Sequence, residues 1–183
     1  MEKHSLEQTA QIAVSMYRAD RFEEAVEKDK GFLRAASASG ALGGAISEVL
    51  SAHREAVASL STCIVERYRW VQQHSLLPSR VSEKRWISFA EQESNKLASM
   101  LQAHTKSLLS KHQAFSGSAG VQLLRQEDYD AQNAKMTMFV KIREATQEVK
   151  KASYRWSLRL LDRILMIVVG AVIAGVAQLY FKR

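Results

Sequence analysis

The sequence predicts an all-α fold: a long antiparallel helical bundle of about three long helices, with an N-terminal helical hairpin before it and a C-terminal transmembrane helix after it. Three observations support this class. Apolar residues recur three and four apart over long stretches, whereas alternation with the strand period of two is missing. The 183 residues include a single proline, Pro78. The stretch 164–181 contains no charged residue.

The first predicted segment covers residues 1–36. Ser5 and Gln8 have the spacing of a capping box, which marks a helix start. The stretch from Ala13 to Leu33 resembles the middle of a tetratricopeptide repeat, in the placement of Ala13, Tyr17, Phe22 and Ala25. The resemblance implies a hairpin of two antiparallel helices, and the apolar stripe of the segment indicates a break near Asp20. We transfer no function from it.

A linker rich in glycine, alanine and serine is predicted at 37–44. It lies within the uncharged stretch AASASGALGGAI at 35–46. Small side chains of this kind form flexible connections or let helices approach closely. The alternative is shallow insertion into a membrane surface, since 12 residues are too few to cross a bilayer as a helix.

Residues 45–163 are predicted to form the long-helix bundle. Helices are expected over about 45–74 and 82–114, and from 121 onward without a break before the last segment. Pro78 separates the first two, Ser82 is the expected N-cap of the second, and SGSAG at 116–120 is the clearest loop. The apolar seam expected on the last helix is Val121, Leu124, Asp128, Ala131, Lys135, Met138, Ile142, Ala145, Val149, Ala152 and Trp156.

Titratable side chains within the bundle are interpreted as structural. His53 and His104 fall on the apolar seams, so we expect satisfied core polar groups rather than metal ligands. Cys63 is expected to be a small packed side chain. The five histidines form no HxxxH or HExxH pair, and no phosphate-binding glycine loop is present. We therefore predict no catalytic residue, no metal site and no cofactor.

Basic residues are concentrated just before the final apolar segment. Residues 1–134 hold 16 basic and 16 acidic residues, whereas residues 135–163 hold eight basic and three acidic ones. This position favours anionic lipid headgroups over nucleic acid as the partner. The predicted lipid-binding residues, here called the basic collar, are Lys150, Lys151, Arg155, Arg159 and Arg163.

The segment 164–181 is predicted to be a transmembrane anchor. A helix of this length reaches about 27 Å, close to the roughly 30 Å hydrocarbon core of a bilayer. Two small-xxx-small pairs within it favour close helix–helix contact, and they predict self-association of the span. The residues concerned are Gly170, Ala171, Ala174 and Gly175.

These features together predict a non-enzymatic, tail-anchored membrane adaptor or scaffold. The N-terminus lacks the apolar core of a secretory signal, so the bulk of the chain is expected in the cytoplasm. The bundle would present its helices to a protein partner or to a second copy of the chain. The alternative is a pore-forming or membrane-permeabilising effector that uses 35–46 and the span. A membrane-tethered enzyme is the third reading.

Overall fold

A computed structural model describes residues 5–39, 42–75, 82–111 and 118–181. The side chains of 39, 42–43, 118–119, 155–160, 162 and 170–181 lie outside that description. The described residues form helices α1 (Leu6–Ser39), α2 (Leu42–His74), α3 (Glu83–Lys111) and α4 (Ser118–Phe181). No strand occurs in these ranges, so the all-α class is confirmed. The chain divides into two compact units, Met1–Ala145 and Thr146–Arg183.

Helix α1 corrects the expectation of an N-terminal hairpin. It is one continuous helix, without a break near Asp20. The predicted capping box is confirmed at its start: the Ser5 amide donates to Gln8 Oε1 (2.9 Å) and the Gln8 amide donates to Ser5 Oγ (3.2 Å). The repeat-like residues Tyr17 and Phe22 pack against the core of the long bundle instead of against a second short helix.

Most of the predicted linker 37–44 is helical, because α1 continues to Ser39 and α2 begins at Leu42. Residues 40–41 lie outside the described residues. Ala36 and Ala45 are buried together with Leu33 in a small apolar cluster, and Leu108 of α3 packs against it.

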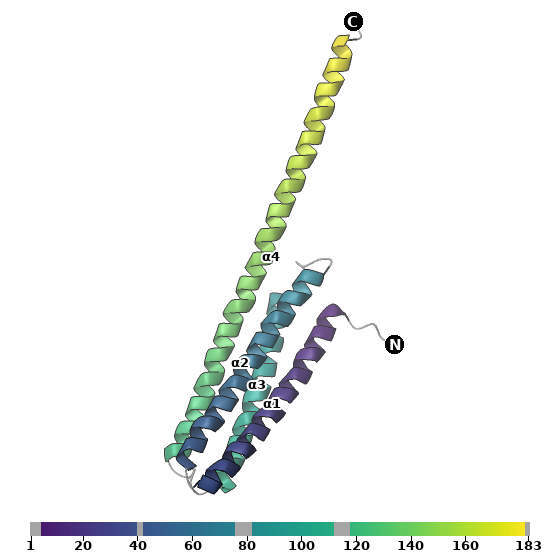
Figure 1. Cartoon of the computed structure of the whole chain (residues 1–183). Helices are drawn as coiled ribbons and strands as arrows, with labels where there is room; N and C mark the ends of the chain where they lie inside the picture. The colour runs from purple at the N-terminus through teal and green to yellow at the C-terminus, as the bar shows by residue number, and fades with distance from the viewer. Residues whose placement is uncertain (1–4, 40–41, 76–81, 112–117, 182–183) are drawn as a thin grey trace. The chain divides into compact units, whose positions relative to one another are not determined.

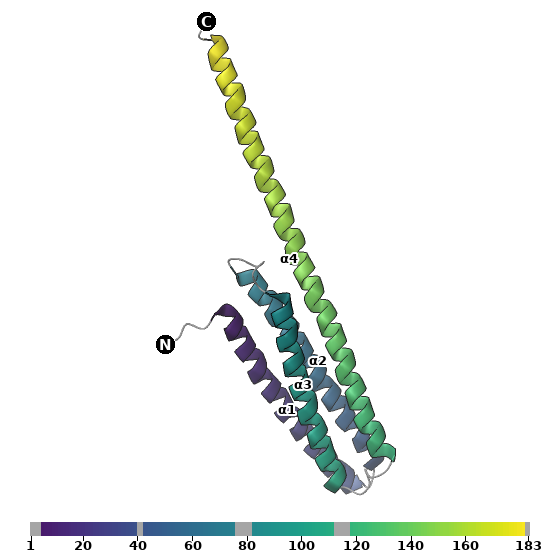
Figure 2. The ribbon, with the colours of Figure 1, turned by 180° about the vertical axis from the view of Figure 1, so that it is seen from behind.

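In the first unit the helices run alternately up and down, as the ribbon shows from both sides (Figures 1 and 2). Side-chain pairs fix the register. Arg18 pairs with Glu93 and Asp29 with His104, so α1 and α3 are parallel with an offset of 75 residues at both pairs. The connections outside the described residues are short, which is typical of antiparallel neighbours.

Small side chains hold α1 and α2 together. Among the described helix pairs, their backbones approach each other most extensively. Alanines at this interface leave room for such an approach: Ala25 and Ala36 on α1, and Ala45, Ala52 and Ala56 on α2 are all buried. Larger side chains fill the other end of the core, where the Tyr68 and Trp86 rings lie 5.5 Å apart.

The structure agrees with the sequence prediction at the N-cap of α3 and along part of the apolar seam of α4. Ser82 is confirmed as the N-cap of α3, since its Oγ accepts the Arg85 amide (3.3 Å). On α4 the seam residues Met138, Ile142 and Ala145 are buried as predicted. Beyond them Val149 is only partly buried and Ala152 is exposed, and the side chain of Trp156 lies outside the described residues.

The first half of the α4 seam is different from the prediction. Val121 is exposed and Asp128 faces solvent, while Leu123 and Glu127 are the buried residues. The reason is that Glu127 finds polar partners on α2 and α3, which turns this part of the helix toward them.

The second unit contains the remainder of α4, from Thr146 onward. Within the described residues, no helix has a stretch long and apolar enough to cross a membrane. The predicted span 164–181 extends beyond them, because the side chains of 170–181 are outside the description.

Candidate functional site

A buried group of ionisable side chains crosses the first unit, and every one of its four helices contributes to it. We call this group the charged layer. Its members are Asp29 on α1, His53 on α2, His104 and Thr105 on α3, and Glu127 on α4.

Each acidic or imidazole group of the layer occupies a core position of its helix. Asp29 lies four residues after Ala25 and four before Leu33, both of which are buried. Glu127 similarly follows Leu123 by four residues, and His53 follows Val49 by four. Helical periodicity therefore carries these polar groups inward together with their apolar neighbours.

His53 is the centre of the layer. The residue is 2% exposed, and both ring nitrogens lie at hydrogen-bond distance from carboxylates. Nε2 donates to Asp29 Oδ2 (2.8 Å), and Nδ1 donates to Glu127 Oε1 (2.5 Å). Thr105 Oγ1 donates to the same Glu127 oxygen (2.6 Å). The His53 imidazole thus links α2 to α1 and α4, and the hydrogen bond from Thr105 links α3 to α4.

This geometry requires an additional proton. A neutral imidazole has one N–H, but two nitrogens here lie at hydrogen-bond distance from carboxylate oxygens. Burial disfavours the charged ring, but the hydrogen bonds and negative charges of Asp29 and Glu127 outweigh it and raise the pKa of His53 to about 9. His53 is therefore an imidazolium at neutral pH.

His104 has the opposite character. Burial lowers its pKa, and the positive charge of His53 acts in the same direction against the attraction of Asp29. Its Nε2 lies 3.1 Å from Asp29 Oδ2, but the direction of approach is not that of a hydrogen bond. The Phe22 ring meets the imidazole edge-on at 6.4 Å. His104 therefore belongs to the layer as a neutral ring.

The layer has little free space. Asp29 Oδ1 and Glu127 Oε2 are buried without a hydrogen-bond partner among the described residues. Beside Glu127 is a cavity of about 10 Å³, which is about the space of one water molecule. Within the described ranges, no group of three or more His, Cys, Asp or Glu side chains is arranged to hold a metal ion.

A second buried carboxylate joins α1 and α3. Glu93 is 2% exposed; Arg18 Nε donates to its Oε2 (2.7 Å), and Lys96 Nζ donates to its Oε1 (2.6 Å). Burial acts to raise the pKa of Glu93, but the two cations outweigh it and the pKa is lowered. This pair is structural, because both carboxylate oxygens are occupied.

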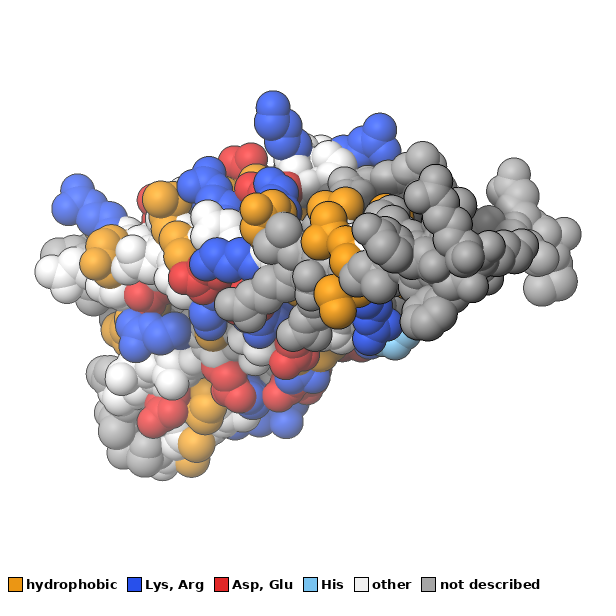
Figure 3. Space-filling model, turned by 90° about the horizontal axis from the view of Figure 1, so that it is seen from above, with side chains coloured by type: hydrophobic (Ala, Val, Ile, Leu, Met, Phe, Trp, Pro, Cys, Tyr) orange, Lys and Arg blue, Asp and Glu red, His pale blue; other side chains and the backbone are white. Residues whose placement is uncertain are grey.

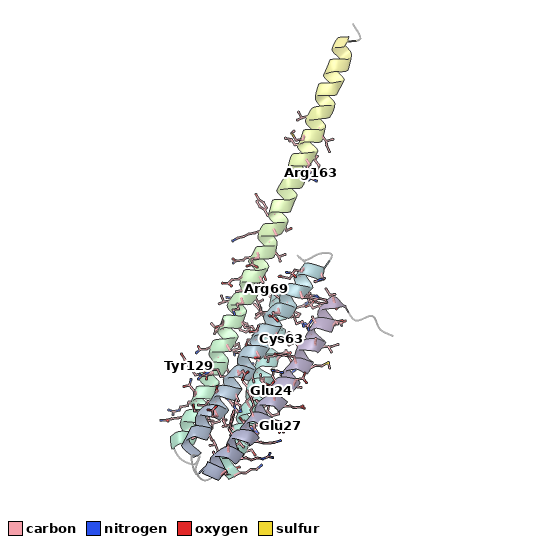
Figure 4. All side chains as sticks on the ribbon, in the orientation of Figure 1. Glu24, Glu27, Cys63, Arg69, Tyr129 and Arg163 are labelled. Atoms are coloured by element: carbon pink, nitrogen blue, oxygen red, sulfur yellow. The ribbon has the colours of Figure 1, made fainter. Side chains whose placement is uncertain are left out.

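The predicted collar and span residues lie on α4, in the second unit. The structure exposes Lys150, Lys151 and Arg163, the last of which is labelled in Figure 4. The side chains of Arg155 and Arg159 lie outside the described residues, as do those of the span residues Gly170, Ala171, Ala174 and Gly175. Lipid binding and self-association therefore stay predictions.

The sequence predicted His53 and His104 to be satisfied polar groups of the core. His53 is buried with both ring nitrogens paired, as expected. His104 is only partly buried, and its Nε2 has no hydrogen-bond partner among the described residues. Sequence reasoning missed Asp29, Thr105 and Glu127. The available signal was an acidic residue midway between two apolar residues of a helical stripe, as at Asp29 between Ala25 and Leu33. Such a position predicts a buried partner, but it does not identify the partner.

The surface of the first unit carries shallow grooves. One of about 620 Å³ is lined by Tyr17, Cys63 and Trp70, among others, and burial raises the pKa of the Cys63 thiol. Another, of about 650 Å³, lies between α1 and α3 beside Ile12 and Met16. Charged side chains of both signs are interspersed with hydrophobic ones over the face seen in Figure 3.

Comparisons with protein-family models, with curated proteins and with solved structures each returned no match.

Proposed function

We propose that this chain is a non-enzymatic, tail-anchored membrane adaptor or scaffold. The uncharged segment 164–181 would lie in the bilayer, and the helical bundle would face the cytoplasm. There it would contact a protein partner or a second copy of the chain. Anchoring raises the local concentration of the bundle surface at the membrane, so that weak contacts suffice for assembly.

The observation that carries this proposal is the exposure of consecutive apolar side chains on α4. Ile164, Leu165, Met166, Ile167, Val168 and Val169 are each between 45% and 71% exposed. Six successive residues cover every side of a helix, so this segment is apolar all round. A helix of this kind is stable when an apolar environment surrounds it, and lipid supplies one.

The basic collar supports the orientation. Lys150 and Lys151 are exposed about four turns before the uncharged stretch that begins at Ile164, and Arg163 directly precedes that stretch. Basic residues at this place are attracted to anionic headgroups and keep their side of the span in the cytoplasm.

The structure gives less support to an effector that inserts residues 35–46. Ala36 and Ala45 of this stretch are buried against Leu33, and Ile46 packs against the same cluster. Insertion would require these contacts to break. A function as an adaptor leaves these contacts intact.

The anchor is tested by membrane extraction of the full-length chain. We expect the chain to remain in the membrane pellet after alkaline carbonate washing and to be released by detergent. Deletion of 164–183 should move it into the supernatant. Recovery of the full-length chain in the supernatant without detergent would refute the proposal.

The collar is tested by vesicle binding of the same chain. We expect Lys150→Gln with Lys151→Gln to weaken binding to phosphatidylserine vesicles about tenfold, because each basic residue near the surface attracts anionic lipid. The matched control, Lys106→Gln with Lys111→Gln on α3, should leave it unchanged. Equal binding to pure phosphatidylcholine vesicles would show that the collar does not recognise charge.

A further inference from the structure

The stretch of α4 between Leu123 and Met138 is attached to the bundle mainly through polar groups. Between Leu123 and Met138, the only buried residue on this helix is Glu127. Arg54 and Asp130 add an ion pair near the surface, with Nη2 and Oδ2 2.9 Å apart. A polar groove of about 330 Å³ separates this part of α4 from α3. Few apolar contacts and solvent-accessible polar ones are typical of a segment that opens locally.

Glu127 is the only member of the charged layer that α4 contributes. When α4 is in place, His53 has a carboxylate at each ring nitrogen, Asp29 from α1 and Glu127 from α4. When α4 leaves, Asp29 remains but Nδ1 loses its acceptor. The second N–H bond of the ring is therefore made only in the closed state.

We propose that helix α4 docks onto α1–α3 with uptake of one proton, which His53 holds between the carboxylates of Asp29 and Glu127. The charged layer then holds α4 against the other helices only while His53 is protonated. It joins the helix that leads to the predicted span to the rest of the bundle. The proposal does not depend on the membrane anchor.

The charges around His53 support this direction. Facing it are Asp29 from α1, the neutral His104 from α3 and Glu127 from α4; Arg54 on its own helix pairs with Asp130 instead. If the His53 ring were neutral, the buried carboxylates of Asp29 and Glu127 would lie on either side of it without a cation between them. With an imidazolium, each carboxylate has a positive partner. Closure and protonation therefore favour each other.

By linkage, loss of the proton weakens docking. The open fraction should rise as pH increases toward about 9, the pKa of His53 in the closed state. Because one proton is involved, the open-to-closed ratio changes by at most about tenfold per pH unit.

The direct test is an NMR titration of histidine in the full-length chain in detergent micelles, with His53→Gln to assign the resonance. We expect Glu127→Gln to lower the pKa of His53 by about one unit or more, since glutamine still accepts the hydrogen bonds but carries no charge. The matched control Asp130→Asn removes a charge from the same helix without touching His53. It should leave that pKa unchanged.

Amide exchange of the unmodified sequence provides an independent test. After correction for intrinsic rates, protection of the α4 amides from Leu123 to Ala134 should fall with rising pH, while protection of the core α2 amides stays constant. An unchanged pKa of His53 in Glu127→Gln would overturn the proposal. So would an equal fall in Asp130→Asn, or α4 protection that is independent of pH.

Discussion

His53 couples the folding equilibrium to pH because both of its ring nitrogens donate to buried carboxylates. Its folded-state pKa of about 9 lies above the ordinary 6.5. The stabilisation is therefore complete below pH 6.5 and is lost as pH rises through about 9. A shift of this size corresponds to about 3 kcal/mol.

We accordingly expect the free energy of unfolding of the full-length chain in detergent to fall by about 3 kcal/mol across that range. Urea titrations at a series of pH values measure it. His53→Gln should abolish this pH dependence, whereas His74→Gln, at an exposed position of α2, should retain it. A parallel decline in the His53→Gln chain would show that another group is responsible.

Glu93 provides a second prediction at this scale. Its lowered pKa means that the stabilisation is present above pH 4.5 and is lost as pH falls below that value. Replacing Glu93 by alanine leaves Arg18, which is only 18% exposed, without its carboxylate. We expect Glu93→Ala to cost about 3 kcal/mol in a urea titration at neutral pH.

The control for Glu93 is Glu91→Ala, at an exposed position of the same helix. It should change the free energy of unfolding by less than about 0.5 kcal/mol. Similar effects of both substitutions would mean that the Arg18 pair does not stabilise α1 against α3.

At the scale of elements, the α1–α2 interface depends on small side chains. Ala56 is buried in the core cluster, and the free space that it lines together with Ala25 of α1 amounts to only about 10 Å³. We expect Ala56→Leu to destabilise the fold by about 2 kcal/mol because of overpacking, seen as a lower thermal midpoint. Ala58→Leu, at an exposed position of the same helix, is the control. A higher midpoint for Ala56→Leu would show that the interface has space to spare.

Helix α4 carries two kinds of surface. Met138 and Ile142 face the core, whereas Met136 and Val140 on the other side are exposed, and so is Tyr129 (Figure 4). The sequence predicted the core side only where the pattern was apolar. It failed at Glu127, because an acidic residue becomes a core residue only when another helix supplies its partner.

At the scale of the whole molecule, the charged layer selects one arrangement of the helices. Asp29, His53 and Glu127 pair only when α1, α2 and α4 have this register, and any slip leaves a buried charge without its partner. Apolar side chains tolerate slippage much better. Buried ionic groups therefore contribute specificity more than stability.

This reasoning predicts the behaviour of a chain with Asp29→Leu, His53→Leu and Glu127→Leu together. We expect it to be at least as resistant to urea as the unmodified chain, but to populate more than one oligomeric state or register. Light scattering after gel filtration and the number of amide resonances measure this. A single species with an unchanged spectrum would contradict a role in specificity.

The sequence by itself determined the helical class, the Ser5 and Ser82 caps and the buried face of α4 around Ile142. These features depend on residues within a few positions of one another, and helical periodicity exposes them directly. Only the tertiary structure decided that α1 is a single helix, because the partners of Tyr17 and Phe22 lie on other long helices. The existence of the charged layer was also visible only in the tertiary structure. Asp29, His53 and Glu127 are far apart in the chain and come together only through the register of the packed helices.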